Sequence, residues 1–148
     1  MSIQFDFPED YLKKLTSKSF EEVARKMEEK AAPVLVESTK KAMRAVVQHE
    51  GDSEMINSVK ASKPATTKTD AVILTVNPKG YSNHTFSRKN KGGKTRKYRV
   101  SNALKAIWLQ YGVAGRQPPR DWLNKSVHDA EKKVNEIMQK VWEEEVGE

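Results

Sequence analysis

LNKSVHDAEKKVNEIMQKV, residues 123–141, is the most regularly patterned stretch of the chain. Its apolar residues follow one another at steps of 4, 3, 4, 3 and 4 positions: Leu123, Val127, Ala130, Val134, Ile137 and Val141. This spacing predicts a long helix with one apolar seam. A helix of about 25 residues is about 37 Å long, which is more than a small domain needs for its own core. The seam is therefore expected to pack either on a sheet of the same chain or on a neighbouring subunit.

A second long helix is predicted in the N-terminal third. Ser19 and Glu22 have the spacing of a capping box, which starts a helix. Apolar residues then recur at three- and four-residue steps as far as Val46. Pro33 removes one helical hydrogen bond and predicts a kink, and Gly51 is expected to mark the end of the pattern.

Between the two helices the apolar pattern changes to a period of two, which predicts short strands. Residues 58–62 and 71–76 are expected to form a hairpin, with its turn at residues 64–68. Residues 81–87 and 95–100 have the composition of two further strands around a glycine-containing turn. An unstructured charged arm would have the same composition, so both alternatives stay open for this last pair.

These elements predict an α+β fold: a small antiparallel sheet of two to four strands, packed by a long kinked N-terminal helix and a long C-terminal helix. Asn102 is expected to cap a further helix, which ends at Gly112. At 148 residues the chain has the usual size of one domain. We therefore expect a single domain over residues 1–148, with a basic loop or arm at about residues 81–100.

The excess positive charge lies in one segment. The chain has 27 Lys and Arg and 20 Asp and Glu, a formal net charge of +7. Seven basic residues and no acidic one lie between residues 88 and 99: Arg88, Lys89, Lys91, Lys94, Arg96, Lys97 and Arg99. Without these seven, 20 basic residues balance 20 acidic ones, so a nearly neutral protein carries a basic loop.

Two kinds of partner suit the basic loop. Seven neutralising contacts would attract nucleic-acid phosphates in a salt-sensitive and sequence-independent way. Only Phe86 and Tyr98 place aromatic rings among the basic residues, however, and no nucleic-acid-binding motif accompanies them. The other interpretation is a solvated arm that becomes ordered on an acidic protein surface. The two roles can coexist.

No pattern in the sequence predicts catalysis, a metal or a cofactor. The absence of cysteine excludes a thiol nucleophile and a cysteine-bound zinc. His49, His84 and His128 lie far apart and lack the spacing of a ligand pair. Residues 93–95 imitate the end of a phosphate-binding loop, but Arg88 stands where the first glycine is required. No apolar run approaches the roughly 20 residues that cross a bilayer, so no membrane partner is expected.

Two motifs in the C-terminal third carry a family resemblance. The first is Trp108, Leu109, Gln110, Tyr111, Gly112, Val113, and the second is Pro118, Pro119, Arg120, Asp121, Trp122, Leu123. Together they resemble the signature of a phage tail-component family: aromatic, two residues, aromatic, Gly, Thr, and later Pro, x, Arg, Pro, Phe, Leu. Met55, Ser58 and Val59 match a further segment of that family. The chain departs from the signature at Val113, at Asp121 and in residues 81–99, which look inserted.

That family supplies tail-completion and neck proteins of long-tailed double-stranded DNA bacteriophages. The resemblance implies a structural, non-enzymatic virion protein that joins head and tail and is present in the host cytoplasm during assembly. Its expected partners are further copies of itself in a ring, a hexamer or a dodecamer that forms from monomers, together with the head connector and tail tube proteins. The alternative is a nucleic-acid-binding module that acts through residues 88–99, and contact with genomic DNA is compatible with both.

The family-signature residues are expected to serve either the fold or a subunit contact: Trp108, Tyr111, Gly112, Pro119, Arg120, Trp122 and Leu123. Gly112 permits a backbone turn that bulkier residues resist. Arg120 is suited to bind neighbouring carbonyls or a carboxylate. Trp122 and Leu123 are expected to anchor the last helix on the sheet. Trp142 is a further interface candidate, because large amphipathic aromatic residues often meet a partner.

Overall fold

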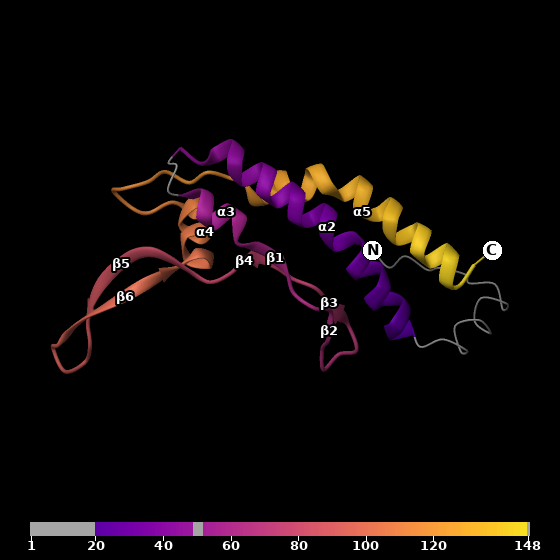
Figure 1. Cartoon of the computed structure of the whole chain (residues 1–148), viewed down its shortest axis with the longest axis horizontal. Coiled ribbons are helices and arrows are strands. Elements are labelled where there is room, and N and C mark those ends of the chain that lie inside the picture. Colours follow the sequence, from indigo (N-terminus) through magenta and orange to yellow (C-terminus); the bar gives the residue numbers. More distant parts are fainter. Residues whose placement is uncertain (1–19, 49–51, 148) are drawn as a thin grey trace, which may run out of the picture.

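Two long helices, α2 (Phe20–Val46) and α5 (Leu123–Glu145), lie side by side in opposite directions (Figure 1). The structure is a computed structural model that describes residues 20–48 and 52–147. Contacts at both ends of the pair agree with the opposite directions: Ser38 Oγ donates to the Ser126 carbonyl at 2.7 Å, and Lys26 pairs with Glu145 at 2.9 Å. The two predicted long helices are therefore confirmed.

Helix α2 begins at Phe20 and continues on both sides of Pro33, whose ring is exposed. The predicted apolar stripe is buried at Val23, Ala31 and Ala42, whereas Phe20 is 62% exposed. Ser19 of the predicted capping box lies outside the described residues, as does Gly51. The described helix ends at Val46, ahead of that glycine.

The buried face of α5 differs from the predicted seam. Ala130 and Val141 are buried, but Leu123 is 40% exposed and Val127 is 52% exposed. Trp122 and Ser126 occupy the buried positions at this end instead. An α-helix has 3.6 residues per turn, so a seam of alternating three- and four-residue steps rotates about 20° per heptad relative to a straight contact line. The main contact of α5 is with α2 of the same chain.

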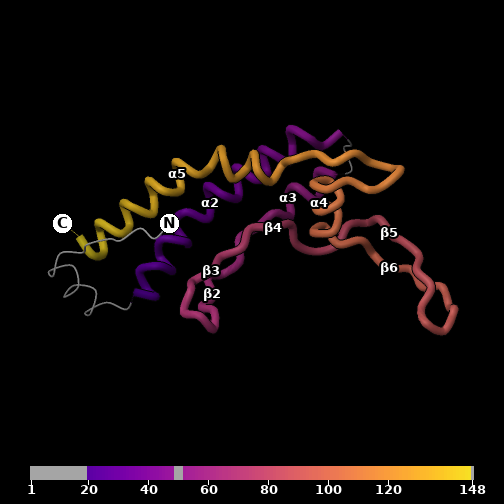
Figure 2. The backbone as a smooth tube through the Cα atoms, turned by 180° about the vertical axis from the view of Figure 1, so that it is seen from behind, coloured from indigo at the N-terminus to yellow at the C-terminus, as the bar shows by residue number. Residues whose placement is uncertain are grey.

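The strands form three separate two-stranded antiparallel pairs, which confirms the α+β class. In chain order the strands are β1 (Val59–Ala61), β2 (Ala65–Thr66), β3 (Val72–Ile73), β4 (Val76–Pro78), β5 (Tyr81–Lys89) and β6 (Thr95–Ser101). Strand β1 pairs with β4, β2 with β3, and β5 with β6. The first four strands form one interrupted hairpin beside α2 (Figures 1 and 2).

The turn of this first hairpin lies further along the chain than predicted. Residues 65–66 are strand rather than turn, and the chain reverses between Thr67 and Ala71. The Thr67 amide donates to the Ala71 carbonyl at 2.8 Å, and the Thr67 hydroxyl accepts from the Ala71 amide at 3.2 Å. This threonine therefore closes a turn that the proline-based prediction placed too early.

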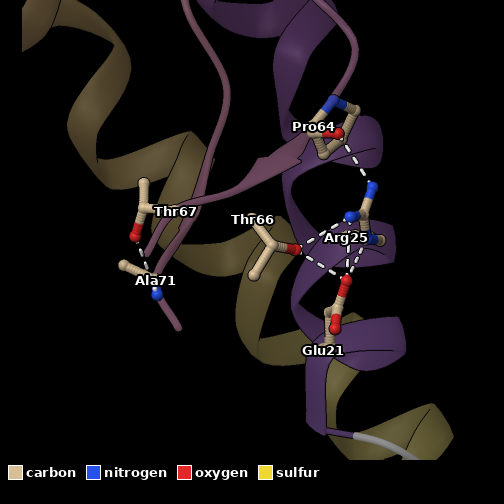
Figure 3. Close-up of polar contacts among 6 residues, drawn as sticks. All are labelled: Glu21, Arg25, Pro64, Thr66, Thr67 and Ala71. Atoms are coloured by element: carbon tan, nitrogen blue, oxygen red, sulfur yellow. Dashed lines mark hydrogen bonds and ion pairs between the residues drawn. The ribbon is translucent and has the colours of Figure 1, made fainter. Parts of the chain in front are cut away.

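A polar clamp holds the hairpin against α2 (Figure 3). Glu21 and Arg25 are one helical turn apart on α2, and both point toward the hairpin. Arg25 donates to the Pro64 carbonyl and to the Thr66 hydroxyl, each at 2.8 Å, and the Thr66 hydroxyl donates to Glu21 at 2.6 Å. The pKa of Glu21 is lowered, first by the Thr66 hydrogen bond and then by Arg25.

The apolar core lies where the C-terminal half of α2 meets two shorter helices and the start of α5. The shorter helices are α3 (Ser53–Asn57) and α4 (Asn102–Tyr111). The buried members of this core are Ala42, Met43, Met55, Ile56, Val59, Ala106, Leu109 and Trp122. Because these residues come from α2, α3, β1, α4 and the residue before α5, the core joins segments that lie far apart in the chain.

The cap of α4 is Ser101 and not Asn102, so the predicted cap was wrong by one residue. The Ser101 hydroxyl accepts from the Leu104 amide at 3.1 Å. Asn102 is buried instead, and its side-chain amide donates to the Lys79 carbonyl at 2.8 Å. The end of α4 at Gly112 is confirmed, with a φ of 77° at that glycine.

Candidate interaction surfaces

Strands β5 and β6 form an arm that projects from one end of the molecule (Figures 1 and 2). This arm, residues 81–101, is a paired hairpin, so the strand alternative is confirmed over the unstructured one. Every side chain from residue 83 to residue 99 is exposed. An element that buries so little of its own surface contributes little to the core, and a two-stranded ribbon of this kind is marginally stable by itself.

The base of the arm is fixed to the body by Ser82 and Val100, which are 1% and 3% exposed. The Ser82 hydroxyl donates to the Val100 carbonyl at 3.0 Å. Arg99 donates to the Ser82 carbonyl at 3.3 Å, so its guanidinium belongs to the base of the arm. The six other predicted basic residues lie beyond this anchor and are all exposed.

The strand register places aromatic and basic side chains on the same face of the arm. Phe86 pairs with Tyr98, and their rings stack with centroids 5.6 Å apart. Arg88 pairs with Arg96 on that face, because side chains two positions apart in a strand point the same way. Like charges directly opposite each other destabilise a ladder. This face is therefore better suited to an anionic partner than to solvent.

The tip of the arm is closed by Asn90, which the sequence analysis did not single out. Its side-chain oxygen accepts from the amides of Gly92 and Lys94, at 3.1 and 2.9 Å. Gly93 follows with a φ of 76°. An asparagine that precedes two glycines is a recognisable signal for such a turn. The turn carries Lys91 and Lys94, and it extends the basic surface to the end of the arm.

The basic character of this end extends beyond the arm. Between Asp70 and Asp121 the sequence contains 11 basic residues and no acidic one. Within residues 20–48 and 52–147, only one of these basic residues forms an ion pair: Lys105 pairs with Asp52 at 2.7 Å. The arm therefore presents charge that the described part of the chain does not neutralise.

The family-signature residues meet in one junction between α4, α5 and the end of α2. Arg120 donates to the Val46 carbonyl and to the Gln48 side chain, each at 2.7 Å. The predicted binding of a carbonyl by Arg120 is thus confirmed, and the carbonyl lies at the C-terminal end of α2. The Trp122 indole is 7% exposed and donates to the Ala106 carbonyl at 3.1 Å.

Gly112 allows the chain to turn tightly inside this junction. Its φ of 77° lies in the region that favours glycine. A Cβ placed here would lie 2.6 Å from the Gln117 carbonyl oxygen and 2.7 Å from the Pro119 nitrogen. The loop from Val113 to Gln117 folds back on itself, with the Val113 amide donating to the Gln117 carbonyl at 2.8 Å. The predicted role of Gly112 in a turn is confirmed.

Helix α5 is capped from the side by Gln110 and from its own start by Asp121. The Gln110 side-chain oxygen accepts from the amides of Trp122 and Leu123, at 3.1 and 2.9 Å. The Asp121 carboxylate accepts from the Asn124 amide at 3.1 Å and from the Gln110 side-chain amide at 2.9 Å. Asp121 therefore has a physical role at the position where the family signature has proline.

The pKa of Asp121 is lowered, because Gln110 and Asn124 donate hydrogen bonds to its charged form. A carboxyl with a lowered pKa stabilises the fold above its unfolded-state pKa, and this contribution is lost as the pH falls through the folded-state pKa. We expect Asp121→Ala to lower the thermal midpoint at neutral pH, and the difference from wild type to shrink below about pH 4. Thermal unfolding followed by circular dichroism measures this difference. An equal difference at neutral and acidic pH would contradict this role.

The remaining signature residues are partly or fully exposed. Tyr111 is 69% exposed, Pro119 is exposed and Leu123 is 40% exposed, so the expectation that Leu123 anchors the helix was wrong. Trp108 is half-buried at the base of the arm, where it lines a cleft of about 610 Å³. The signature residues thus divide into those that hold the junction together and those that are accessible to a partner.

Trp142 lies at the end of the helical pair that is remote from the arm (Figure 1). Its ring contacts Phe20 edge to face, with centroids 6.3 Å apart and planes at 69°. Phe20 is 62% exposed, and Trp142 is half-buried. The structure therefore brings Trp142 to a surface that is separate from the basic arm and from the signature junction.

Among residues 20–48 and 52–147, no group of three or more His, Asp or Glu side chains is placed to hold a metal ion. None of the helices described is long and apolar enough to cross a membrane.

Comparison with known proteins found no relative of this chain. No family model, no curated protein and no solved structure matches the chain. A functional proposal for this protein therefore depends on its own motifs and geometry.

Proposed function

We propose that this protein is a structural assembly subunit of a long-tailed bacteriophage, a tail-completion or head–tail joining protein. It forms a ring between the head connector and the tail tube and has no enzymatic activity. The observation that carries this proposal is the arm, whose side chains from residue 83 to residue 99 are all exposed. An ordered, charged hairpin that is buried only at its base and exposes its remaining side chains is an element for contact with another molecule.

The signature junction supports the same proposal. Gly112, Arg120 and Trp122 occupy one structural unit, in which a tight turn, a helix-end contact and a core residue are each required. This is the set of residues on which the resemblance to the tail-component family depends. The junction connects α4 to α5 and positions both relative to α2, so these residues set the geometry of the body that carries the arm.

Joining of heads and tails tests the proposal directly. Purified protein is incubated with filled phage heads that lack it and with separate tails, and joined particles are counted by negative-stain electron microscopy. The matched variant replaces residues 86–98 with Asn-Gly, which closes a short hairpin and keeps the anchor residues Ser82 and Val100. We expect wild type to restore joining and the variant, with an unchanged circular dichroism spectrum, to fail.

Two outcomes would contradict parts of this proposal. Equal joining by both proteins would exclude the arm from the joining function. If wild-type protein joins nothing but retains duplex DNA at moderate salt, a nucleic-acid-binding module takes the place of the structural subunit. The stacked Phe86 and Tyr98 rings between arginines are the feature that such a module would use.

A further inference from the structure

Among the described residues, the two ends of the molecule carry opposite charge. The arm has seven basic residues and no acidic one between residues 88 and 99. At the other end lie the start of α2 and the end of α5 (Figures 1 and 2). Residues 20–30 and 136–147 there contain eight Glu and four Lys or Arg, a net charge of −4. We call this second surface the acidic end.

Each of these surfaces also presents a pair of aromatic rings. On the arm, Phe86 and Tyr98 are stacked and are 38% and 41% exposed. At the acidic end, Phe20 is 62% exposed and rests on Trp142. Aromatic residues and arginine are enriched in protein–protein contacts. The two surfaces thus combine aromatic area with charges of opposite sign.

The monomer cannot bring these surfaces together, because they lie at opposite ends of the same body (Figure 1). Arg88 and Arg96 face each other across the arm without an acidic partner among the described residues. Carboxylates from another molecule would convert this repulsion into charge-assisted hydrogen bonds, for which guanidinium groups are well suited. Glu143 and Glu144 are exposed carboxylates beside Trp142 and can supply them.

We propose that the arm of one copy docks on the acidic end of the next copy. The contact joins two different surfaces, so it is head-to-tail and repeats from subunit to subunit, which produces a closed ring when the rotation permits. This inference rests on the proposed ring-forming function and names the partner of the arm as a second copy of this chain. It also assigns Trp142 and Phe20 to the same interface as Phe86 and Tyr98.

Charge reversal in both surfaces tests the docking. The arm-reversed variant is Arg88→Glu with Arg96→Glu, and the end-reversed variant is Glu143→Lys with Glu144→Lys; all four side chains are exposed, so the fold should be retained. We expect each variant alone to lose self-association by about tenfold or more. A one-to-one mixture should recover it, because the glutamates introduced in the arm of one variant then face the lysines introduced at the end of the other. Absence of recovery in the mixture would overturn the proposal.

Cross-linking detects the contact even where it is weak in solution. The chain has no cysteine, so Ser87→Cys on the arm and Gln139→Cys near the acidic end can be introduced alone or together. With a bismaleimide at high protein concentration, the double variant should give a ladder of dimers, trimers and larger products, whereas each single variant should remain largely monomeric, because the contact then holds one cysteine and not two. Adding the end-reversed substitutions should remove the ladder. A ladder that survives them, its absence in the unreversed double variant, or prominent dimers from Ser87→Cys alone would overturn the proposal.

Failure of this inference is distinguishable from failure of the proposed function. Heads and tails that join normally while the cross-linked ladder is absent would remove the self-contact and leave the joining role in place. A charge-sensitive ladder without joining would establish the self-contact and remove the phage role.

Discussion

Replacing Trp122 with alanine is expected to lower the free energy of unfolding by about 3–5 kcal/mol. The indole is 7% exposed and belongs to the core cluster formed by α2, α3, α4 and β1. Its truncation leaves a cavity and also leaves the Ala106 carbonyl without its indole donor, which lies at 3.1 Å. Urea denaturation followed by circular dichroism measures the change.

Trp142→Ala is the matched control for this prediction. This variant also truncates a tryptophan to alanine, but Trp142 is half-buried and contacts Phe20 outside the core cluster. An edge-to-face aromatic pair contributes about 1 kcal/mol beyond its buried area. We therefore expect a clearly smaller loss of stability for Trp142→Ala. Equal losses for the two variants would show that the core does not depend on Trp122 as described.

Gly112→Ala is expected to destabilise the protein by about 3 kcal/mol or more, because two costs coincide at this position. The φ of 77° is unfavourable for alanine, and the added Cβ would lie within 2.6 Å of the Gln117 oxygen and 2.7 Å of the Pro119 nitrogen. Both of these neighbours are backbone atoms, which cannot rotate away as a flexible side chain does. Relief of the clash must therefore displace the loop that leads to Arg120.

Gly115→Ala separates the two costs. Gly115 has a similar φ of 69°, but an added Cβ would meet nothing within 4 Å. The backbone cost alone is about 1 kcal/mol. Chemical denaturation of both variants should therefore show the Gly112 variant to be the less stable by a wide margin. Similar stabilities would mean that the loop moves freely and that Gly112 is not required for the junction.

Much of the fold could be predicted because the signals are local. The steps of three and four residues before Val46 and after Leu123 predicted both long helices, and the period of two predicted the first hairpin. For the arm, a strand pair was one of two alternatives that the sequence left open. The glycines near residue 92 and the flanking polar residues predicted the turn of the arm. In the candidate site, the cluster of basic residues was visible in the sequence, and so was the turn at Gly112.

Other features could not be predicted because they depend on distant parts of the chain. The cap of α4 fell to Ser101 because Asn102 is drawn into a hydrogen bond with Lys79. Leu123 was expected in the core, yet the buried face of α5 is set by its contact with α2. Gln110 showed no capping signal, because the helix that it caps begins after an intervening loop.

The sequence by itself thus determined the types of element, their order and the place of the unbalanced positive charge, since each of these depends on neighbouring residues. Only the tertiary structure decided that Arg120 binds the end of α2, 74 residues away. It also decided that Arg88 opposes Arg96 and that the arm and Trp142 lie at opposite ends of the molecule. These features follow from strand register and from packing between segments that are remote in the chain, and a local pattern cannot encode either one.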